Sequence, residues 1–254
     1  MSKGFSITLP DGEYFLKDID QAAAEAPNFP PVRKIYGYRG GPRKIKAKSR
    51  KNKAEMPAFS RVTLEGDYEF AAFYWLEANP LVQWYKPQPF KVRFHDGLTT
   101  TTYVGDFLAR MVDGSYTIYE VKKSTNLDDP DVAKRLENLQ KAFLKTNVKF
   151  EVLLSDELTA QPRLQTWMYL YGKTRSALTK KAVLQTAKQE FLKSLTHLGG
   201  SAKLIELKKT SPLVNETGLA LAIFDGVVTS KYRLPICDGF DAFYTAQGEN
   251  QWVD

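Results

Sequence analysis

The sequence predicts an α/β fold in which helices flank a mixed sheet. Apolar side chains recur at helical spacing in one segment and alternate as in half-buried strands in the three segments that follow. An amphipathic helix then precedes one more strand. The expected elements are a helix at 64–78, strands at 91–94, 102–110 and 116–122, a helix at 131–146 and a strand at 150–154. This order favours an α/β core, because each element buries an apolar face against another layer.

A second, helical domain is expected after Pro162, where strand-like alternation gives way to helical periodicity. Helices are predicted at 164–171, 180–198, 202–209 and 217–224, with a trailing hairpin through 225–228 and 232–234. This pattern indicates a domain of winged-helix type. The predicted division is an N-terminal extension with a basic arm at 1–54, an α/β core at 55–160 and a helical domain at 161–254 that interacts with partners or DNA. Within the extension, only a short helix at 22–26 is expected.

The composition is ordinary for a globular protein, with 43% hydrophobic and 26% charged residues over 254 positions. No apolar run is long enough to cross a bilayer, and the N-terminus lacks the apolar core of a signal peptide. Cys237 is the only cysteine, which excludes an intrachain disulfide and a zinc site built from several cysteines. We therefore expect a cytoplasmic protein with no membrane partner.

A stretch of basic residues without a single acid runs from 33 to 53, in a chain whose net charge is +7. Its members are Arg33, Lys34, Arg39, Arg43, Lys44, Lys46, Lys48, Arg50, Lys51 and Lys53. Glycines and Pro42 interrupt the stretch, so an extended arm is expected rather than a helix. One reading is a solvated tail. The other is contact with the DNA backbone, which basic side chains favour by neutralising phosphates.

Four charged residues in three short stretches form a candidate catalytic set. Glu69 lies in the first predicted helix, Asp106 in a strand, and Glu120 and Lys122 at the end of the next strand. Carboxylates of this kind are the ligands that Mg²⁺ prefers. Asp106 and Glu120 are the expected main ligands of one or two Mg²⁺ ions, for which Mn²⁺ would substitute, and Glu69 completes the set. Lys122 would orient a water and stabilise negative charge.

The same pattern has a plain structural reading, because Glu-x-Lys is common on the solvated face of a strand. Glu65, one turn before Glu69, is the main rival for the role of the helical acid. Gln88 follows the helix and is a possible further site residue or only a turn residue. The two histidines, His95 and His197, are far apart in sequence, so a triad with a serine or cysteine nucleophile is not expected.

The hairpin around Asp113 and Gly114 decides whether this site can form. A two-residue turn would pair Asp106 with Val121 and turn its carboxylate to the wrong face of the sheet. A three-residue loop shifts the register by one and aligns Asp106 with Glu120 or Lys122, and Gly114 can adopt the left-handed conformation such loops favour. The sequence therefore predicts an odd-length loop or a bulge here.

Residues 35–158 resemble the TnsA family of transposon-end endonucleases. The resemblance lies in residues 60–69, the helix that follows, residues 77–89, Tyr103-Val104-Gly105-Asp106-Phe107 and Tyr119-Glu120-Val121-Lys122. Two positions depart from related patterns: Gly105 stands where the wider nuclease superfamily usually has Pro, and some family members carry Gln at the position of Glu120.

The resemblance implies a restriction-endonuclease-like nuclease core in which the three acids and Lys122 carry catalysis. It implies a Mg²⁺-dependent enzyme that nicks double-stranded DNA at the 5′ ends of a mobile element during cut-and-paste transposition. The implied partners are a TnsB-like transposase and a TnsC-like ATPase regulator, contacted by the winged-helix-like domain. The alternatives are another nuclease on the same core, such as a restriction or junction-resolving enzyme, and a non-catalytic adaptor that bridges DNA and an assembly.

Overall fold

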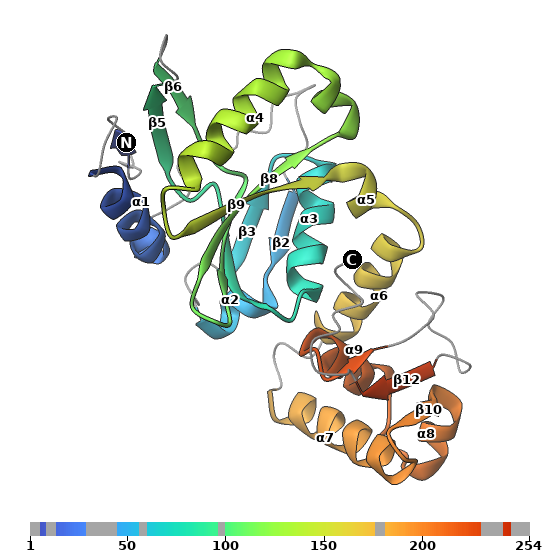
Figure 1. Cartoon of the computed structure of the whole chain (residues 1–254). Coiled ribbons are helices and arrows are strands. Elements are labelled where there is room, and N and C mark those ends of the chain that lie inside the picture. The colour runs from blue at the N-terminus through green and yellow to red at the C-terminus, as the bar shows by residue number, and fades with distance from the viewer. Residues whose placement is uncertain are drawn as a thin grey trace. The chain divides into compact units, whose positions relative to one another are not determined.

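The computed structural model describes residues 6–8, 14–28, 45–55, 60–95, 100–175, 181–229 and 241–244 (Figure 1). Two compact units divide the chain. The first contains the residues up to Ala72 and from Val82 to Leu158, and the second contains Phe73–Leu81 and the chain from Thr159 onward. The expected boundary at 160 therefore lies close to the point where the chain enters the second unit. The N-terminal extension and the α/β core share one unit.

A four-stranded mixed sheet forms the centre of the first unit, in the order β4-β7-β8-β9. The strands are β4 (Val82–Pro87), β7 (Phe107–Met111), β8 (Tyr116–Lys122) and β9 (Val148–Leu154). Strand β7 is antiparallel to both of its neighbours, β4 and β8, whereas β8 and β9 are parallel and are connected through helix α4 (Pro130–Phe143). The predicted mixed α/β architecture is confirmed.

One face of this sheet is covered by α4 and by helix α1 (Tyr14–Glu25), which continues into the 3₁₀ turn Ala26–Asn28. The side chains that make this core are Ile19, Ala22 and Ala23 of α1, Leu136, Leu139 and Phe143 of α4, and Trp84, Leu108, Ile118 and Val148 of the sheet. Helix α4 begins where the Asp129 carboxylate accepts a hydrogen bond from the Asp131 backbone N–H at 2.9 Å, with Pro130 at its first position.

Smaller elements complete the first unit. A three-stranded sheet has the order β1 (Ser6–Thr8), β5 (Lys91–His95) and β6 (Thr100–Tyr103), and β2 (Ile45–Lys48) pairs with β3 (Arg61–Leu64). The helical segments are α2 (Arg50–Glu55), the start of α3 (Asp67–Ala78), the 3₁₀ turn Ser124–Asp128 and α5 (Ser155–Thr159). Helix α3 belongs to the second unit from Phe73 onward. Strand β3 leads directly into α3, and β6 leads towards β7.

The strand expected at 102–110 is instead two strands, β6 and β7, which belong to different sheets. The break falls at 104–106. A Cβ on Gly105 would lie 2.6 Å from the Ile118 Cγ2, so only glycine allows the backbone to bend this close to β8. The bend leaves Asp106 immediately before β7.

The N-terminal expectations also need correction. The helix expected at 22–26 spans Tyr14–Glu25, and residues 50–53 of the expected extended arm lie in helix α2. Strand β4 was not expected, because its side chains are buried on both faces and show no alternation. The part of the basic arm at 33–44 lies outside the described residues.

The second unit contains α6 (Arg163–Arg175), α7 (Lys181–His197), α8 (Leu204–Thr210) and α9 (Glu216–Phe224). Its strands are β10 (Ser201–Lys203), β11 (Val228–Thr229) and β12 (Asp241–Tyr244), in the order β10-β12-β11. Helix α9 is buried from Gly218 to Phe224. A Cβ on Gly218 would lie 2.4 Å from the Ala187 carbonyl oxygen, so this glycine permits close packing of α9 on α7.

One detail of the second unit differs from expectation. The helix expected at 202–209 begins at Leu204, since Ser201–Lys203 forms a strand. Strand β11 pairs with β12, and the segment at 232–234 lies outside the described residues, so the expected hairpin stays a prediction.

The β7–β8 connection is a three-residue loop, as the sequence predicted. Arg110 pairs with Tyr116, and the Met111 N–H donates to the Ser115 carbonyl at 2.9 Å, which leaves Val112, Asp113 and Gly114 in the loop. Gly114 has a φ of +87°. The Asp113 carboxylate accepts hydrogen bonds from the Ser115 N–H and Oγ at 2.9 and 2.7 Å.

We predict that Gly114→Ala destabilises the protein by about 1 kcal/mol, the cost of a left-handed backbone for an L-residue. The matched control is Gly172→Ala in α6, which is also in open space but has no positive φ, and it should gain about 0.5 kcal/mol. Chemical denaturation measures both changes. An unchanged free energy of unfolding for Gly114→Ala would contradict the role assigned to the loop.

Candidate functional site

All four predicted catalytic residues line one pocket of about 390 Å³ in the first unit. The pocket is formed by the segment before α3, the first turn of that helix, the bend between β6 and β7, the end of β8 and the side of α4. Its lining residues are Glu65, Gly66, Tyr68, Glu69, Tyr103, Val104, Asp106, Glu120, Val121, Lys122 and Arg135. Four of these side chains are acids and two are cations.

The register of the β7–β8 hairpin brings Asp106 to the site. Phe107 pairs with Tyr119, so one step further along the same register Asp106 stands opposite Glu120. The Val121 N–H donates to the Asp106 Oδ2 at 2.8 Å, and this bond fixes the direction of the carboxylate. On the other side, the Gln88 N–H donates to the Asp106 carbonyl at 2.9 Å. The backbone of two strands therefore holds Asp106 in place.

The pKa of Asp106 is raised to about 7, first by burial and then by the neighbouring charges of Glu120 and Glu69, against the Val121 hydrogen bond and Lys122, which lower it. Burial penalises the charged carboxylate, and the two nearby acids add to this penalty. The three acids therefore interact electrostatically as one group.

Glu120 is held from both sides. Only 8% of its surface is exposed, and both of its carboxylate oxygens have partners. The Oε2 accepts a hydrogen bond from the Tyr103 hydroxyl at 2.9 Å, and the Oε1 lies 2.6 Å from the Lys122 Nζ. Side chains two positions apart on a strand point to the same side, which explains the contact between Glu120 and Lys122.

The structure distinguishes Glu69 from its rival Glu65, although both line the pocket. Glu69 lies in the first turn of α3, and its Oε2 accepts a hydrogen bond from the Glu65 backbone N–H at 2.7 Å, which ties the helix to the segment just before it. It is Glu69 whose charge raises the pKa of Asp106. Glu65 instead accepts a hydrogen bond from the Gln88 Nε2 at 2.8 Å.

Gln88 does not line the pocket but bonds to two residues that do. It is buried, it is the one non-glycine residue with a positive φ (47°) in the described part of the chain, and it contacts both the Asp106 backbone and the Glu65 side chain. A strained backbone of this kind persists only when its surroundings hold it. Gln88 thus connects the segment before α3 with the bend before β7.

Sequence reasoning missed two residues of the pocket, Tyr103 and Arg135. Tyr103 is fully buried, and its ring packs edge-on against Phe143 and Phe150 at centroid distances of 6.4 and 6.0 Å. Burial and the nearby carboxylates raise its pKa far above the usual value. Tyr103 begins the stretch 103–107 on which the resemblance partly rests, but nothing in that stretch shows that its side chain joins the site, and no motif marks Arg135. Only the position of Arg135 beside the apolar stripe of α4 could have placed it near the sheet.

The basic residues predicted to contact DNA are only partly described. Lys46 and Lys48 are exposed on β2, and the exposed Arg61 of β3 stands directly opposite Lys48. The Lys51 Nζ donates to the Val82 carbonyl, so this ammonium contacts β4. Arg50 is half-buried in α2, and of Lys53 only the backbone is described. Arg33, Lys34, Arg39, Arg43 and Lys44 lie outside the described residues.

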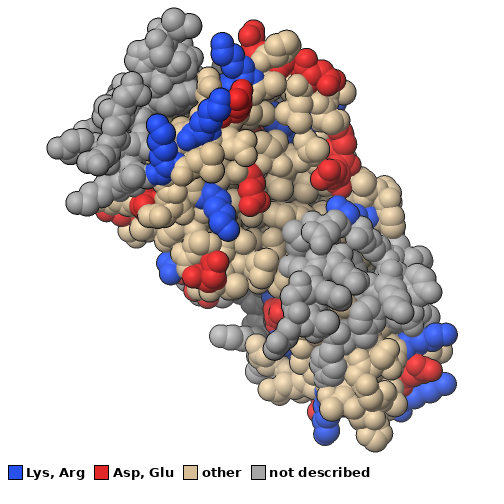
Figure 2. Space-filling view, in the orientation of Figure 1, with Lys and Arg blue, Asp and Glu red and all other residues tan. Residues whose placement is uncertain are grey.

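Basic and acidic side chains are interspersed on the face shown in Figure 2. The described surface on this side therefore carries no uniform charge. The exposed cations Lys46, Lys48 and Arg61 of the β2–β3 pair form a small cluster and are not part of an extended positive surface on this side.

The donor set suits a hard divalent cation, since three carboxylates share one open pocket and the charges of Glu120 and Glu69 raise the pKa of Asp106. Among the described residues, however, no three His, Cys, Asp or Glu side chains already form a metal-binding group. The reason lies in their present partners: Glu120 is bonded to Tyr103 and Lys122, and Glu69 to the Glu65 N–H. Glu69, Asp106 and Glu120 could hold an ion after these side chains turn.

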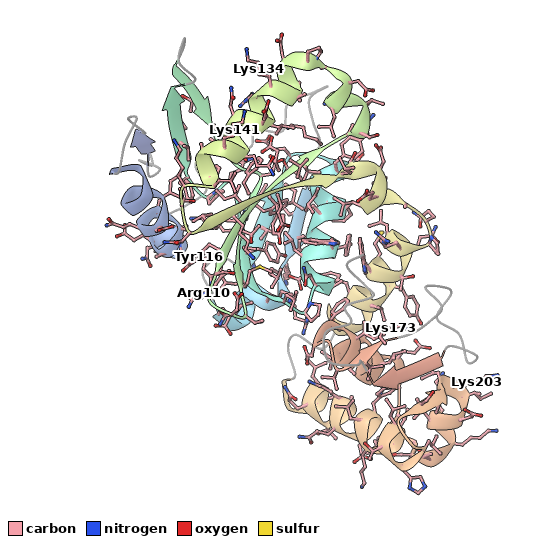
Figure 3. The ribbon with its side chains drawn as sticks, viewed as in Figure 1. Arg110, Tyr116, Lys134, Lys141, Lys173 and Lys203 are labelled. Carbon is pink, nitrogen blue, oxygen red and sulfur yellow. The ribbon has the colours of Figure 1, made fainter. Side chains whose placement is uncertain are left out.

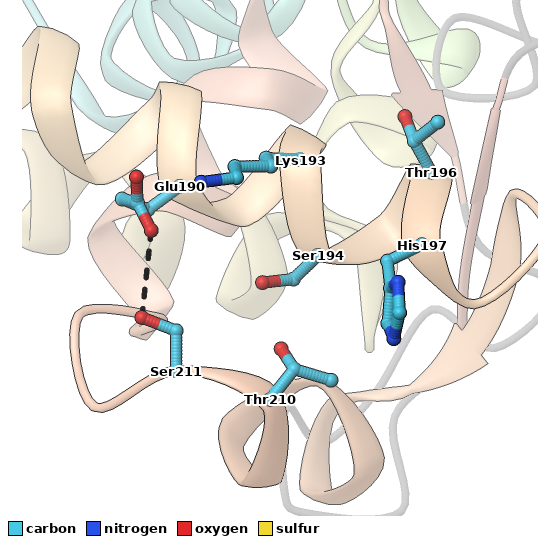
Figure 4. Close-up of a pocket in the computed structure, with 7 residues that line it drawn as sticks. All are labelled: Glu190, Lys193, Ser194, Thr196, His197, Thr210 and Ser211. Carbon is cyan, nitrogen blue, oxygen red and sulfur yellow. Dashed lines mark hydrogen bonds between the residues drawn. The ribbon is translucent and has the colours of Figure 1, made fainter.

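A second pocket lies in the second unit, between α7 and the end of α8 (Figure 4). Its lining residues are Glu190, Lys193, Ser194, Thr196, His197, Thr210 and Ser211. The bond drawn there joins the Ser211 hydroxyl to Glu190 at 3.5 Å. Within the described residues no hydrogen bond pairs His197 with a hydroxyl of this pocket, so the arrangement of a serine nucleophile and its base is not present.

Comparison with protein-family models and with curated proteins finds no match for this chain. Within the described residues, no helix combines the length and apolar character that crossing a membrane requires.

We predict that Asp106→Asn stabilises the metal-free protein at pH 8. The folded-state pKa of Asp106, about 7, lies above the ordinary 3.8. The folded protein therefore binds the extra proton between about pH 4 and 7, and its stability falls as pH rises through this window. Removing the charge should recover on the order of 2 kcal/mol at pH 8 and little at pH 4.

Thermal denaturation at the two pH values without divalent ions measures this effect. Asp113→Asn on the same hairpin is the control. Hydrogen bonds from Ser115 lower the pKa of Asp113, so folding favours the charged form of this carboxylate and removing its charge should not stabilise the protein. If both variants were more stable than the wild type at pH 8, or if neither were, the electrostatic explanation would be contradicted.

Proposed function

We propose that this chain is a metal-dependent DNA endonuclease. The observation that carries the proposal is the three-residue loop, which aligns Asp106 with Glu120 in a pocket shared with Glu69 and Lys122. Four charged groups from three separate segments converge there, and three of them are only partly exposed carboxylates. Structural ion pairs do not explain such an excess of acid, whereas a site for a cation does.

The architecture supports a restriction-endonuclease-like core for this enzyme. Helix α3 precedes an antiparallel run of β4, β7 and β8, and α4 then leads to the parallel strand β9. The sheet sets the positions of Asp106 and Glu120, and helix α3 adds Glu69.

The residues have separable roles on this proposal. Glu69, Asp106 and Glu120 would hold one or two Mg²⁺ ions, or Mn²⁺ in their place. A bound ion supplies polarisation of the phosphate and a more acidic attacking water. Lys122 orients the water and balances negative charge at the phosphate, and its ion pair with Glu120 keeps the ammonium at the pocket.

The biological reaction that fits best is nicking at the 5′ ends of a mobile element in cut-and-paste transposition. The resemblance of residues 35–158 to the TnsA family supports it, together with the partners that this family implies, a transposase and an ATPase regulator. The exposed Lys46, Lys48 and Arg61 of the β2–β3 pair offer positive charge for the backbone of duplex DNA.

We assign the second unit to a winged-helix-like module for partner contacts. Its order of α7, β10, α8, α9, β11 and β12 supports this assignment. Helix α9 is buried along its length, so it cannot enter a DNA groove as a recognition helix does. Contacts with partners would therefore use other surfaces of the unit.

The direct test is cleavage of a supercoiled plasmid that carries the element ends, with and without the co-encoded transposase. We expect Mg²⁺-dependent nicks at the 5′ ends and a loss of at least about 100-fold in Asp106→Asn, because a carboxylate essential to the ion is gone. Asp113→Asn should cut like the wild type. Undiminished cutting by Asp106→Asn would refute the proposal, and equal cutting without the transposase would favour another nuclease of this core.

Tyr103 gives a second test, because its hydroxyl orients the proposed ligand Glu120. Tyr103→Phe should weaken Mg²⁺ binding about 10-fold, the usual cost of losing a hydrogen bond to a metal ligand. Tyr119→Phe is the matched control, since this buried tyrosine lies on β8 but alternates to the opposite face from Glu120. Isothermal titration measures both affinities. An unchanged Mg²⁺ affinity in Tyr103→Phe would show that the Tyr103 hydroxyl does not orient a metal ligand and that the residue only packs in the core.

A further inference from the structure

Arg135 lies on the side of α4 that borders the pocket. Leu136, Leu139 and Phe143 form the buried stripe of this helix, and Arg135 lies one turn before Leu139 beside that stripe. The side chain is exposed and lines the same pocket as Asp106 and Glu120. Its charge also acts on the Tyr103 hydroxyl, whose pKa it lowers against the larger effects of burial and the carboxylates.

The two cations of the pocket differ in their partners. Lys122 is bonded to Glu120 at 2.6 Å. Arg135 makes no hydrogen bond or ion pair with any residue that the structure describes, although four acids line the same pocket. An arginine that stands beside carboxylates without pairing to them has all five N–H donors available for another anion.

The anion that enters this pocket in the proposed reaction is a phosphodiester. A pocket lined by four carboxylates repels phosphate unless cations face it from the open side. Guanidinium presents a planar fork of donors that matches two phosphate oxygens, which an ammonium does not. We propose that Arg135 binds the phosphate of the DNA strand being cut. This inference rests on the proposed function and adds the residue that seats the substrate.

The test compares Arg135→Ala with Lys134→Ala. Lys134 is the preceding residue on α4, labelled in Figure 3; it is exposed and does not line the pocket. Binding of a labelled DNA duplex is measured by fluorescence anisotropy at several salt concentrations, on an Asp106→Asn background so that the duplex stays intact. Arg135→Ala should reduce the slope of log affinity against log salt by about 0.9, the value of one phosphate contact, and Lys134→Ala should leave it unchanged.

A second arm measures single-turnover cleavage by the otherwise wild-type protein. Arg135→Ala should slow cleavage about 100-fold relative to the wild type. Arg135→Lys should keep the salt slope, because the positive charge remains. It should still cut about 10-fold more slowly than the wild type, because the planar fork of guanidinium donors is lost. Mg²⁺ affinity and circular dichroism spectra should be the same in the wild type, Arg135→Ala and Arg135→Lys.

Equal salt slopes in the wild type and Arg135→Ala, or an equal reduction in Lys134→Ala, would overturn the inference. The two proposals fail separately. Suppose that the wild type cuts no DNA, but that Arg135→Ala, unlike Lys134→Ala, has a reduced salt slope. The proposed phosphate contact would then be supported and the proposed nuclease activity refuted.

Discussion

The register between β7 and β8 is the constraint on which the site depends. Three loop residues, with Gly114 in a left-handed conformation, set Phe107 against Tyr119 and so bring Asp106 opposite Glu120. A shift of one residue would turn one of these carboxylates to the other face of the sheet, since side chains alternate along a strand. The remaining parts of the pocket are then added around this pair: Glu69 from α3, Tyr103 from the strand before the bend and Arg135 from α4.

The pocket keeps charges together that would be more stable apart. Burial and two neighbouring acids hold the pKa of Asp106 near 7, while Tyr103 and Lys122 occupy the oxygens of Glu120. A fold selected only for stability would place an apolar or amide side chain at such a position. The backbone bonds from Val121 and Gln88 to Asp106 show that the surrounding structure is built to hold this residue in place. The unfavourable electrostatics and the rigid support together point to a function for the site.

Sequence reasoning succeeded where the signal was local. The spacing between Asp106 and Glu120 and the glycine at 114 were enough to predict an odd-length loop, because strand periodicity is two and Gly114 tolerates a positive φ. It failed where the cause lies far away in the chain. The break of the strand at Gly105 depends on the approach of Ile118, and the inward position of Lys86 in β4 depends on the Ala26 carbonyl that its Nζ contacts. Tyr103 and Arg135 join the site through tertiary packing. The stretch 103–107 carries Asp106, but nothing local shows that the Tyr103 hydroxyl or the Arg135 side chain reaches the same pocket.

On the proposed function, the charge of the pocket also sets an order of events. Four acids face two cations, and one of those cations, Lys122, is already bonded to Glu120. A phosphate that arrives before a divalent cation meets a net negative surface, with Arg135 as its main attraction among the described residues. After the cation is bound, the same carboxylates no longer oppose the substrate. Contact of DNA with exposed Lys46, Lys48 and Arg61 needs no such ion. Capture of the duplex and admission of its scissile phosphate are therefore separate steps, and a bound metal favours only the second.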